Sequence, residues 1–543
     1  MSRRLFASLC TLIVIGAFAW LAHTRIPHEQ ILRYDEATHV FEGMVLRDEL
    51  ARGEYSDFVR RFDEEMTMKG ILYRVYFAVA FLITEVGTDS ARHAGLFACL
   101  VALFLIGRLA RELAPDEDKD AAGFFAVLFA ATSPLLGYWG RTAMVEPLNL
   151  LTLQLALWLC VREQRLRTRA ALAWCVVGLV VAFFTKYNHA VILFAAVGLD
   201  ALLRAWKPSG ESLPGATRLT PLRPILIAGL IAAAWLAVPR HFHDFVYYIK
   251  TVPGGSDPVN LGGWTYAVTL RDRVGAGVVA SLFLAACFVA ALGRALRART
   301  RLVLLHLGIG LVLAQMNDLK LERILVPLSG DVFVLAGLGA PRLWAFVTRF
   351  ARGFPGAVGV VFGVLLTTAF GVATFRVETN PLQQLEQVVD AGIDSIRAGK
   401  RTLWIGQAFF KGMEKHGTPR ITASHVMIRA RERGIDLPRT TFEVLSYEQQ
   451  ERLGYETYKG NPSKVTKASV DAFVANYDSI VIVYDTPTKE PNLIETIPRK
   501  FAEFVRAHPA FKVVDRVDLP LRDIEGPGRT VVCTVIRLTR SKR

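Results

Sequence analysis

Several features that would assign a chemistry directly are missing from this sequence. No cysteines have the spacing of metal ligands, and Cys533 is the one cysteine after residue 380, so that part of the chain cannot form an internal disulfide. No glycine-rich phosphate loop introduces any expected strand, so nothing supports a nucleotide site. No convincing internal repeat is present either, although repeats are typical of many transporters.

Charge is also scarce, and apolar residues are abundant. Charged residues make up 21% and hydrophobic residues 52% of the 543 residues, with a mean hydropathy of +0.32. Apolar runs recur from Leu5 to Phe375, each of roughly 17–20 residues and long enough to cross about 30 Å of hydrocarbon. After Asn380 the composition becomes that of an ordinary globular chain. The sequence therefore predicts a membrane domain over 1–379 and a second domain over 380–543.

The net charge of +15 raises the question of nucleic-acid binding, and the placement of the basic residues argues against it. Arginines cluster in short loops between apolar runs, as the positive-inside rule describes for cytoplasmic loops. They are Arg162, Arg165, Arg167, Arg169, Arg294, Arg297, Arg299, Arg301, Arg342, Arg349 and Arg352. We therefore expect membrane lipids around the protein and no nucleic-acid partner.

About eleven membrane spans are expected in the inner (plasma) membrane. They cover 5–22, 92–110, 121–139, 146–162, 169–185, 188–204, 222–240, 275–293, 302–316, 324–340 and 355–375. The first run follows Arg3 and Arg4, so a cleaved signal peptide is an alternative for it. Its length and the spans that follow favour a retained helix.

The apolar segment 71–86 decides the topology. It is short and contains Arg74 and Glu85, which are costly to place across lipid. If it crossed the membrane, the arginine-rich loops would face outward, against the positive-inside rule. We therefore interpret it as a juxtamembrane or re-entrant helix within a first outer loop, 23–91. This interpretation places the C-terminal domain outside the cytoplasm.

The C-terminal domain has the pattern of an α/β fold. Candidate strands, rich in β-branched and aromatic residues, cover 402–405, 479–484, 511–517 and 530–538. Helical spacing of apolar residues covers 382–396 and 493–508. The fold class expected for the chain is an α-helical polytopic membrane domain followed by an extracytoplasmic α/β domain.

Carboxylates stand out at the membrane borders on the outer side. Asp35 and Glu36 are adjacent just beyond the first span, and Glu146 follows the third. A carboxylate there can act as a general base or bind a metal, whereas the alternative for Asp35 is an ordinary helix N-cap. His39 lies one helical turn after Asp35, as a proton shuttle or, alternatively, as a packed or solvated side chain.

Cations accompany these carboxylates on the same side. Lys69, Arg141, Lys186 and Arg323 each lie at an expected membrane border. Each of them alone is compatible with a side chain that merely snorkels to the interface. Together with the carboxylates, they supply what a phosphate-bearing lipid donor requires: cations for the phosphate and a base for the acceptor.

These motifs, in this order, resemble those of membrane glycosyltransferases of the GT-C class. The similarity is greatest to the branch of lipid A aminoarabinose transferase and protein O-mannosyltransferase, and it covers about residues 1–375. It rests on Asp35-Glu36-Ala37, Gly53, Lys69, Arg141 with Glu146-Pro147, Thr185-Lys186, and Lys320 with Arg323 and Pro327.

The resemblance implies a polyprenyl-phosphate-linked sugar as donor, an inverting transfer and an extracytoplasmic site. It makes Asp35 the catalytic base and Glu36 its neighbour in acceptor binding or metal coordination. Lys69 becomes a site cation, while Lys186 and Arg323 contact the donor phosphate. Glu146 stands where that branch commonly has Asp, Ile324 where an aromatic residue commonly follows the arginine, and His39 where Tyr is frequent.

The sequence leaves several points open. It fixes neither the sugar nor the acceptor, and a divalent metal remains an option without assigned ligands. A lipid-linked sugar transporter or flippase, and a non-catalytic membrane scaffold, are the alternative functions.

Overall fold

The computed structural model describes two compact units. It describes residues 3–26, 34–56, 70–206, 220–239, 241–243, 245–246, 265–275, 278–316, 322–350, 385–393, 396, 401–405, 423–435, 442–444, 471–472, 474–485, 507–522 and 530–540. The first unit comprises Met1–Ile26, Leu46–Val79 and Arg92–Glu378, and the second comprises Pro27–Val45, Ala80–Ala91 and Thr379–Arg543. The second unit thus includes parts of the 23–91 loop as well as the C-terminal domain.

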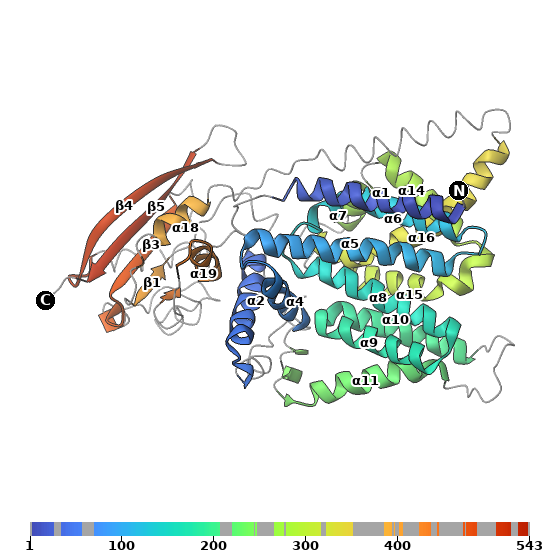
Figure 1. Ribbon diagram of the computed structural model, residues 1–543, viewed down its shortest axis with the longest axis horizontal. Coiled ribbons are helices and arrows are strands. Elements are labelled where there is room, and N and C mark those ends of the chain that lie inside the picture. Colours follow the sequence, from blue (N-terminus) through green and yellow to red (C-terminus); the bar gives the residue numbers. More distant parts are fainter. Residues whose placement is uncertain are drawn as a thin grey trace. The chain divides into compact units, whose positions relative to one another are not determined.

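Helices dominate the described residues before 351. They are α1 Arg3–His23, α2 Tyr34–Arg52, α4 Leu72–Ile83, α5 Thr88–Leu113, α6 Lys119–Ala131, α7 Pro134–Trp139, α8 Val145–Leu166, α9 Arg169–Thr185, α10 Tyr187–Trp206, η1 Thr220–Leu222, α11 Arg223–Leu236, α13 Thr265–Thr269, η2 Leu270–Val274, α14 Val278–Ala291, α15 Arg294–Met316, η3 Glu322–Leu325 and α16 Val326–Phe350. Within the first unit, α9 packs against α8, α10 and α11, and these helices run side by side (Figure 1).

Lengths and compositions of these helices are those of a multi-pass membrane protein. In the described part of the chain, Arg4–His23, Thr88–Leu113, Tyr187–Trp206 and Arg323–Val347 are long and apolar enough to cross a membrane. Shorter apolar helices accompany them at Leu72–Ile83, Arg169–Thr185, Thr220–Leu236 and Ser281–Ala291. The total of eleven spans stays a prediction, and the segment expected at 355–375 lies outside the described residues.

The segments expected at 71–86 and 121–139 form helices shorter than a full span. The helix α4 has 12 residues and is therefore about 18 Å long, too short to cross the hydrocarbon, which agrees with a juxtamembrane role. The span expected at 121–139 is divided into α6 and α7, because Pro134 opens α7 and holds Ser133 in an extended conformation.

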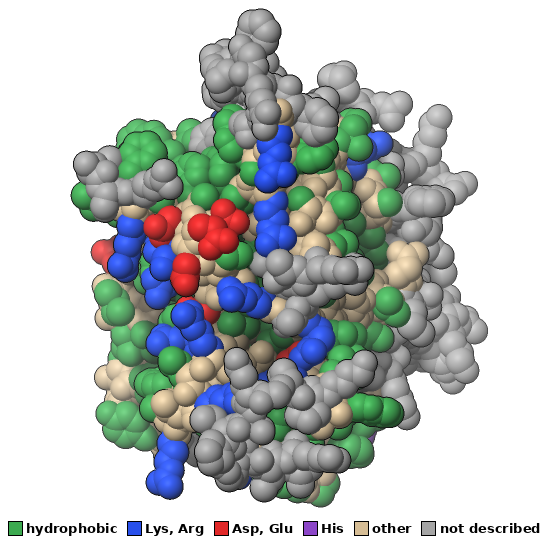
Figure 2. Space-filling view, turned by 90° about the vertical axis from the view of Figure 1, so that its right-hand side faces the viewer, with side chains coloured by type: hydrophobic (Ala, Val, Ile, Leu, Met, Phe, Trp, Pro, Cys, Tyr) green, Lys and Arg blue, Asp and Glu red, His purple; other side chains and the backbone are tan. Residues whose placement is uncertain are grey.

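One end of the helical unit carries charge of both signs. Arg165 of α8 binds Glu112 at 2.9 Å, and Arg301 of α15 binds Asp200 of α10 at 2.6 Å. Figure 2 shows Lys and Arg side chains gathered over this end, interspersed with Asp and Glu. The arginine-rich loops after α8 and before α15 thus share one end, as the charge pattern predicts.

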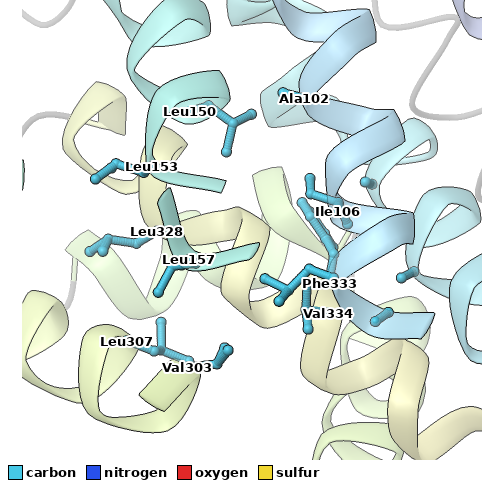
Figure 3. Close-up of a cluster of buried hydrophobic side chains, with 14 of the residues drawn as sticks. Ala102, Ile106, Leu150, Leu153, Leu157, Val303, Leu307, Leu328, Phe333 and Val334 are labelled. Atoms are coloured by element: carbon cyan, nitrogen blue, oxygen red, sulfur yellow. The ribbon is translucent and has the colours of Figure 1, made fainter. Parts of the chain in front are cut away.

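An apolar core fills the helical unit, and α5, α8, α15 and α16 contribute to it. Figure 3 shows Ile106, Leu157, Leu307, Leu328 and Phe333 in this core, and each is at most 5% exposed. Core residues recur at helical spacing along a helix, as Leu150, Leu153 and Leu157 do on α8 and Val303 and Leu307 do on α15, so each helix buries one face.

The second unit contains a five-stranded sheet. Its strands are β1 Thr402–Ile405, β2 Phe442–Val444, β3 Ser479–Asp485, β4 Phe511–Arg522 and β5 Thr530–Arg540, and its strand order is β2-β1-β3-β5-β4. The strand β1 pairs in parallel with β2 and β3, whereas β5 pairs antiparallel with β3 and β4. The sequence predicts four of these strands and misses β2.

Helices α18 (Leu385–Ile393) and α19 (Ala423–Glu432) cover one face of this sheet. Val389 of α18 and Val426 of α19 form a buried cluster with Trp404, Val481 and Val535 from the strands. The α/β pattern of the sequence is therefore present in the structure. The helix expected at 493–508 lies almost entirely outside the described residues.

A distant carboxylate caps the start of α5. The backbone N–H of Thr88 donates to Glu432 Oε1 at 2.7 Å, and the Thr88 hydroxyl donates to the same oxygen at 2.5 Å. Glu432 is held in turn by Arg429, which also donates twice to Asp390. The hydrogen bond with Asp390 raises the pKa of Arg429. This contact ties the 80–91 segment to the C-terminal domain within the second unit.

Candidate active site

Glu146 lies in the first turn of α8. The helix begins at Val145, and Pro147 fits there because the first backbone N–H groups of a helix need no partner within it. A carboxylate at this position is favoured by the helix dipole. The Glu146 side chain is nevertheless 1% exposed, so it requires a positive partner.

Lys186 is that partner. It lies between α9 and α10 in an extended conformation, and its Nζ is 2.9 Å from Glu146 Oε1. The lysine side chain is 7% exposed, so it does not snorkel into solvent. The sequence predicts both residues as site residues, but not that they form a buried ion pair.

A hydrogen bond connects the segment of Lys186 to the segment that carries Arg323. His189, in the first turn of α10, lies with its Nε2 atom 3.2 Å from the carbonyl oxygen of Ile324. Asn188 accepts from the His189 backbone N–H at 2.9 Å and orients the residue. The segment that carries Lys186 is thus bonded to the one that carries Arg323.

Gly70 also packs against this region. A Cβ atom at Gly70 would clash with the carbonyl group of Phe184 and with the backbone of Thr185, so no larger residue fits there. Gly70 directly follows Lys69 in the chain, and Lys69 itself lies outside the described residues.

Arg141 has contacts of an anchoring kind. Its Nη1 donates to the backbone carbonyl of Arg25 at 3.0 Å, and its guanidinium lies 5.9 Å from the centre of the Tyr138 ring. It therefore holds the turn after α1 against the turn before α8. A role in substrate binding, as the sequence suggests, stays a prediction.

The helix α2 carries the remaining candidates, which belong to the second unit. Asp35 lies in the first turn of this helix, and its side chain is outside the described residues. Glu36 and His39 are both buried, with 2% and 1% exposure. Burial agrees with the alternative in which His39 packs inside the protein.

Asn149 is a candidate that the sequence analysis missed. It lies one turn after Glu146 on α8, is fully buried, and has no hydrogen-bond partner for its side-chain amide among the described residues. Buried amides normally have partners, so a polar group of a bound molecule or a water is expected here. A polar residue inside an otherwise apolar run was the available signal.

One oxygen of the Glu146 carboxylate accepts a hydrogen bond from Lys186. Among the described residues, no group of three or more His, Cys, Asp or Glu side chains could hold a metal ion. A divalent metal therefore stays a prediction without assigned ligands.

Part of the chain matches a known protein family. Residues 69–236 match the sequence model of the family described as dolichyl-phosphate-mannose-protein mannosyltransferase. This segment contains Lys69, Arg141, Glu146 and Lys186. No curated protein sequence matches the chain.

Solved structures are similar over a much longer stretch. ArnT from Cupriavidus metallidurans in the apo state has a TM-score of 0.57 at 12% identity, covering 96% of this chain and 97% of ArnT. ArnT bound to undecaprenyl phosphate has a TM-score of 0.54 at 12% identity, with 96% and 97% covered. The mycobacterial arabinofuranosyltransferase AftD has a TM-score of 0.56 at 17% identity, covering 100% of this chain and 40% of AftD. With the family match, these likenesses show that the chain has the GT-C fold of membrane glycosyltransferases.

Proposed function

We propose that the protein is an inner-membrane glycosyltransferase that moves a monosaccharide from a polyprenyl-phosphate carrier to a hydroxyl group on the extracytoplasmic side. The observation that carries this proposal is the buried Lys186–Glu146 pair, which His189 connects to the segment of Arg323. A paired lysine and a neighbouring arginine at the ends of apolar helices suit a lipid whose tail stays in the bilayer and whose head carries a phosphate. The ArnT structure with undecaprenyl phosphate supports this donor class.

The proposed reaction is a single displacement. The acceptor oxygen attacks the anomeric carbon while the bond from that carbon to the phosphate oxygen breaks, and polyprenyl phosphate leaves with the electron pair. Asp35 takes the acceptor proton, as its place at the start of α2 and the family resemblance suggest. Attack opposite the leaving group inverts the anomeric configuration.

Each cation has a distinct part in this proposal. Arg323 offers two parallel N–H donors to the phosphate oxygens, whereas Lys186 contributes a point charge held in place by Glu146. Lys69 is assigned as a third cation from the sequence, since it directly precedes Gly70, which packs against Phe184 and Thr185. Negative charge develops on the phosphate as it leaves. Positive groups that are already in place stabilise this charge, and in comparable sites one such donor lowers the activation barrier by about 3 kcal/mol.

The remaining groups complete the binding of the two substrates. Glu36 supports the acceptor beside Asp35, and Arg141 fixes the turn before α8. No step in the proposal runs through a metal ion, and the sugar and the acceptor stay unassigned.

A direct assay tests the proposal. The full-length protein, purified in detergent, is incubated with polyprenyl-phosphate sugars and candidate acceptors from the cell envelope. We expect free polyprenyl phosphate together with a glycosylated acceptor, and neither product with Asp35→Asn. Movement of the intact lipid-linked sugar across a vesicle membrane without its cleavage would instead favour a flippase.

A further inference from the structure

A second polar cluster lies deeper in the helical unit, and the proposed reaction does not use it. Asp331 of α16 binds His306 of α15, with 2.6 Å between Oδ2 and Nδ1. Gln154 of α8 donates its side-chain N–H to the other Asp331 oxygen at 3.1 Å. All three side chains are fully buried.

The surroundings of this cluster are apolar. Gln154 lies between Leu153 and Leu157 in the sequence of α8, and His306 precedes Leu307 on α15. These three leucines belong to the apolar core (Figure 3). Ionisable groups inside a membrane domain are costly and persist where they have a function or a fixed partner. The fold also makes room for the contact, because a Cβ atom at Gly330 would clash with the Gln154 side chain.

Together with two contacts of the candidate site, the Gln154–Asp331 bond forms a closed loop of contacts between helices. Glu146 joins α8 to Lys186, and His189 of the next helix bonds to Ile324. From Ile324 the chain runs seven residues to Asp331, which returns to α8 through Gln154, eight residues after Glu146. The stretch from Ile324 to Asp331 is about 11 Å long and the stretch from Glu146 to Gln154 is about 12 Å long, so the two lengths match.

A closed loop of this kind fixes the two cation-bearing segments against each other. The Gln154–Asp331 bond is a directional contact between α8 and α16, seven residues after Ile324. Rotation or sliding of α16 relative to α8 would break this bond and would shift the segment of Arg323 relative to that of Lys186. A fully satisfied buried polar contact rigidifies the packing of the helices that it joins.

We propose that Asp331, His306 and Gln154 are positioning residues that hold Arg323 in register with Lys186 for binding of the donor phosphate. This inference rests on the proposed function. The three residues touch neither substrate, and they act through α16. His306 acts by holding the Asp331 carboxylate, since Asp331 binds both His306 and Gln154.

The first test replaces the cluster by apolar residues. In the variant Gln154→Leu/His306→Leu/Asp331→Leu, no buried charge is left unpaired, and replacements of buried ion pairs by apolar residues are often neutral or stabilising. We expect an unchanged or higher midpoint of thermal unfolding. The donor KM should rise by about 10- to 100-fold, because small misplacements of binding groups have effects of that order. The acceptor KM should stay the same. Leu157→Ala is the control: it removes core packing and should lower the unfolding midpoint without selectively raising the donor KM.

The second test is a double-mutant cycle, which also decides the matter if the triple variant does not fold. Gln154→Leu and Arg323→Ala should each raise the donor KM, and their combination should be no worse than Arg323→Ala alone. Additive effects, or a folded triple variant with an unchanged donor KM, would overturn the inference. If Arg323→Ala and Lys186→Ala themselves leave the donor KM unchanged, the proposed function has failed instead.

Discussion

Lys186 Nζ lies 2.9 Å from Glu146 Oε1, and neither side chain is exposed by more than 7%. The two residues are 40 positions apart in the sequence, at the starts of two different helices. The pair therefore fixes the start of α8 to the connection between α9 and α10. It also holds the Lys186 side chain in one conformation before substrate binds. A phosphate can then bind without reorganisation of the site.

Loss of the Glu146 charge should destabilise the protein. We expect Glu146→Gln to lower the free energy of unfolding by about 3 kcal/mol, because it leaves the buried Lys186 ammonium without a counter-charge. The midpoint of thermal unfolding in detergent measures this effect. Glu112→Gln is the matched control: its partner Arg165 is 64% exposed, and exposed pairs contribute at most about 1 kcal/mol. Equal decreases of the unfolding midpoint in the two variants would show that the Glu146–Lys186 pair stabilises the protein no more than an exposed ion pair does.

Sequence alone could supply much of the fold and the identity of several site residues. Apolar runs predicted the helices α8, α9, α10 and α15, and β-branched residues predicted β1 and β3. The break at Pro134 was also readable, since proline ends a helix before it. The strand β2 has three residues, too few to show alternation.

The contacts between site residues were harder to predict from the sequence than the residues themselves. Lys186 and Glu146 are each recognisable as polar residues at helix ends, but their contact depends on how α8 and α10 pack. The same holds for Asp331, whose two partners come from helices elsewhere in the chain. Periodicity identifies a buried face and says nothing of which distant face it meets.

Donor binding should depend on both cations. Lys186→Ala and Arg323→Ala should each raise the donor KM by about 10- to 100-fold at saturating acceptor, since a hydrogen bond to a charged group is worth about 1.5–3 kcal/mol. Arg323→Lys should be impaired as well, because lysine cannot reproduce a planar contact with two phosphate oxygens. Steady-state kinetics with a polyprenyl-phosphate sugar measure these constants. If both residues merely anchor helix ends, Arg323→Lys would be nearly silent and the donor KM of the alanine variants would not change.

The orientation of the helical unit can be tested by cysteine labelling. In a cysteine-free background, Ser56→Cys should react with a membrane-impermeant maleimide added from outside, and Arg165→Cys should react only after the membrane is permeabilised. Both positions are exposed in the structure, so burial does not prevent labelling of either. The expectation follows from the arginine-rich loops, which the positive-inside rule places in the cytoplasm. Labelling of position 165 in intact cells would reverse the topology.

The proposed base gives the sharpest test of the chemistry. We expect Asp35→Asn to lower kcat by about 10²–10⁴-fold, because the amide cannot accept the acceptor proton. Asp35 lies in the first turn of α2, where one negative charge contributes about 0.3–1 kcal/mol, so the midpoint of thermal unfolding should change little. Donor binding should persist, since the cations assigned to the phosphate are unchanged. Glu36→Gln makes the same change of charge one residue away and should act mainly on the acceptor KM. Near-native turnover of Asp35→Asn would remove Asp35 from the mechanism and would direct the search for the base to another carboxylate of the outer loop.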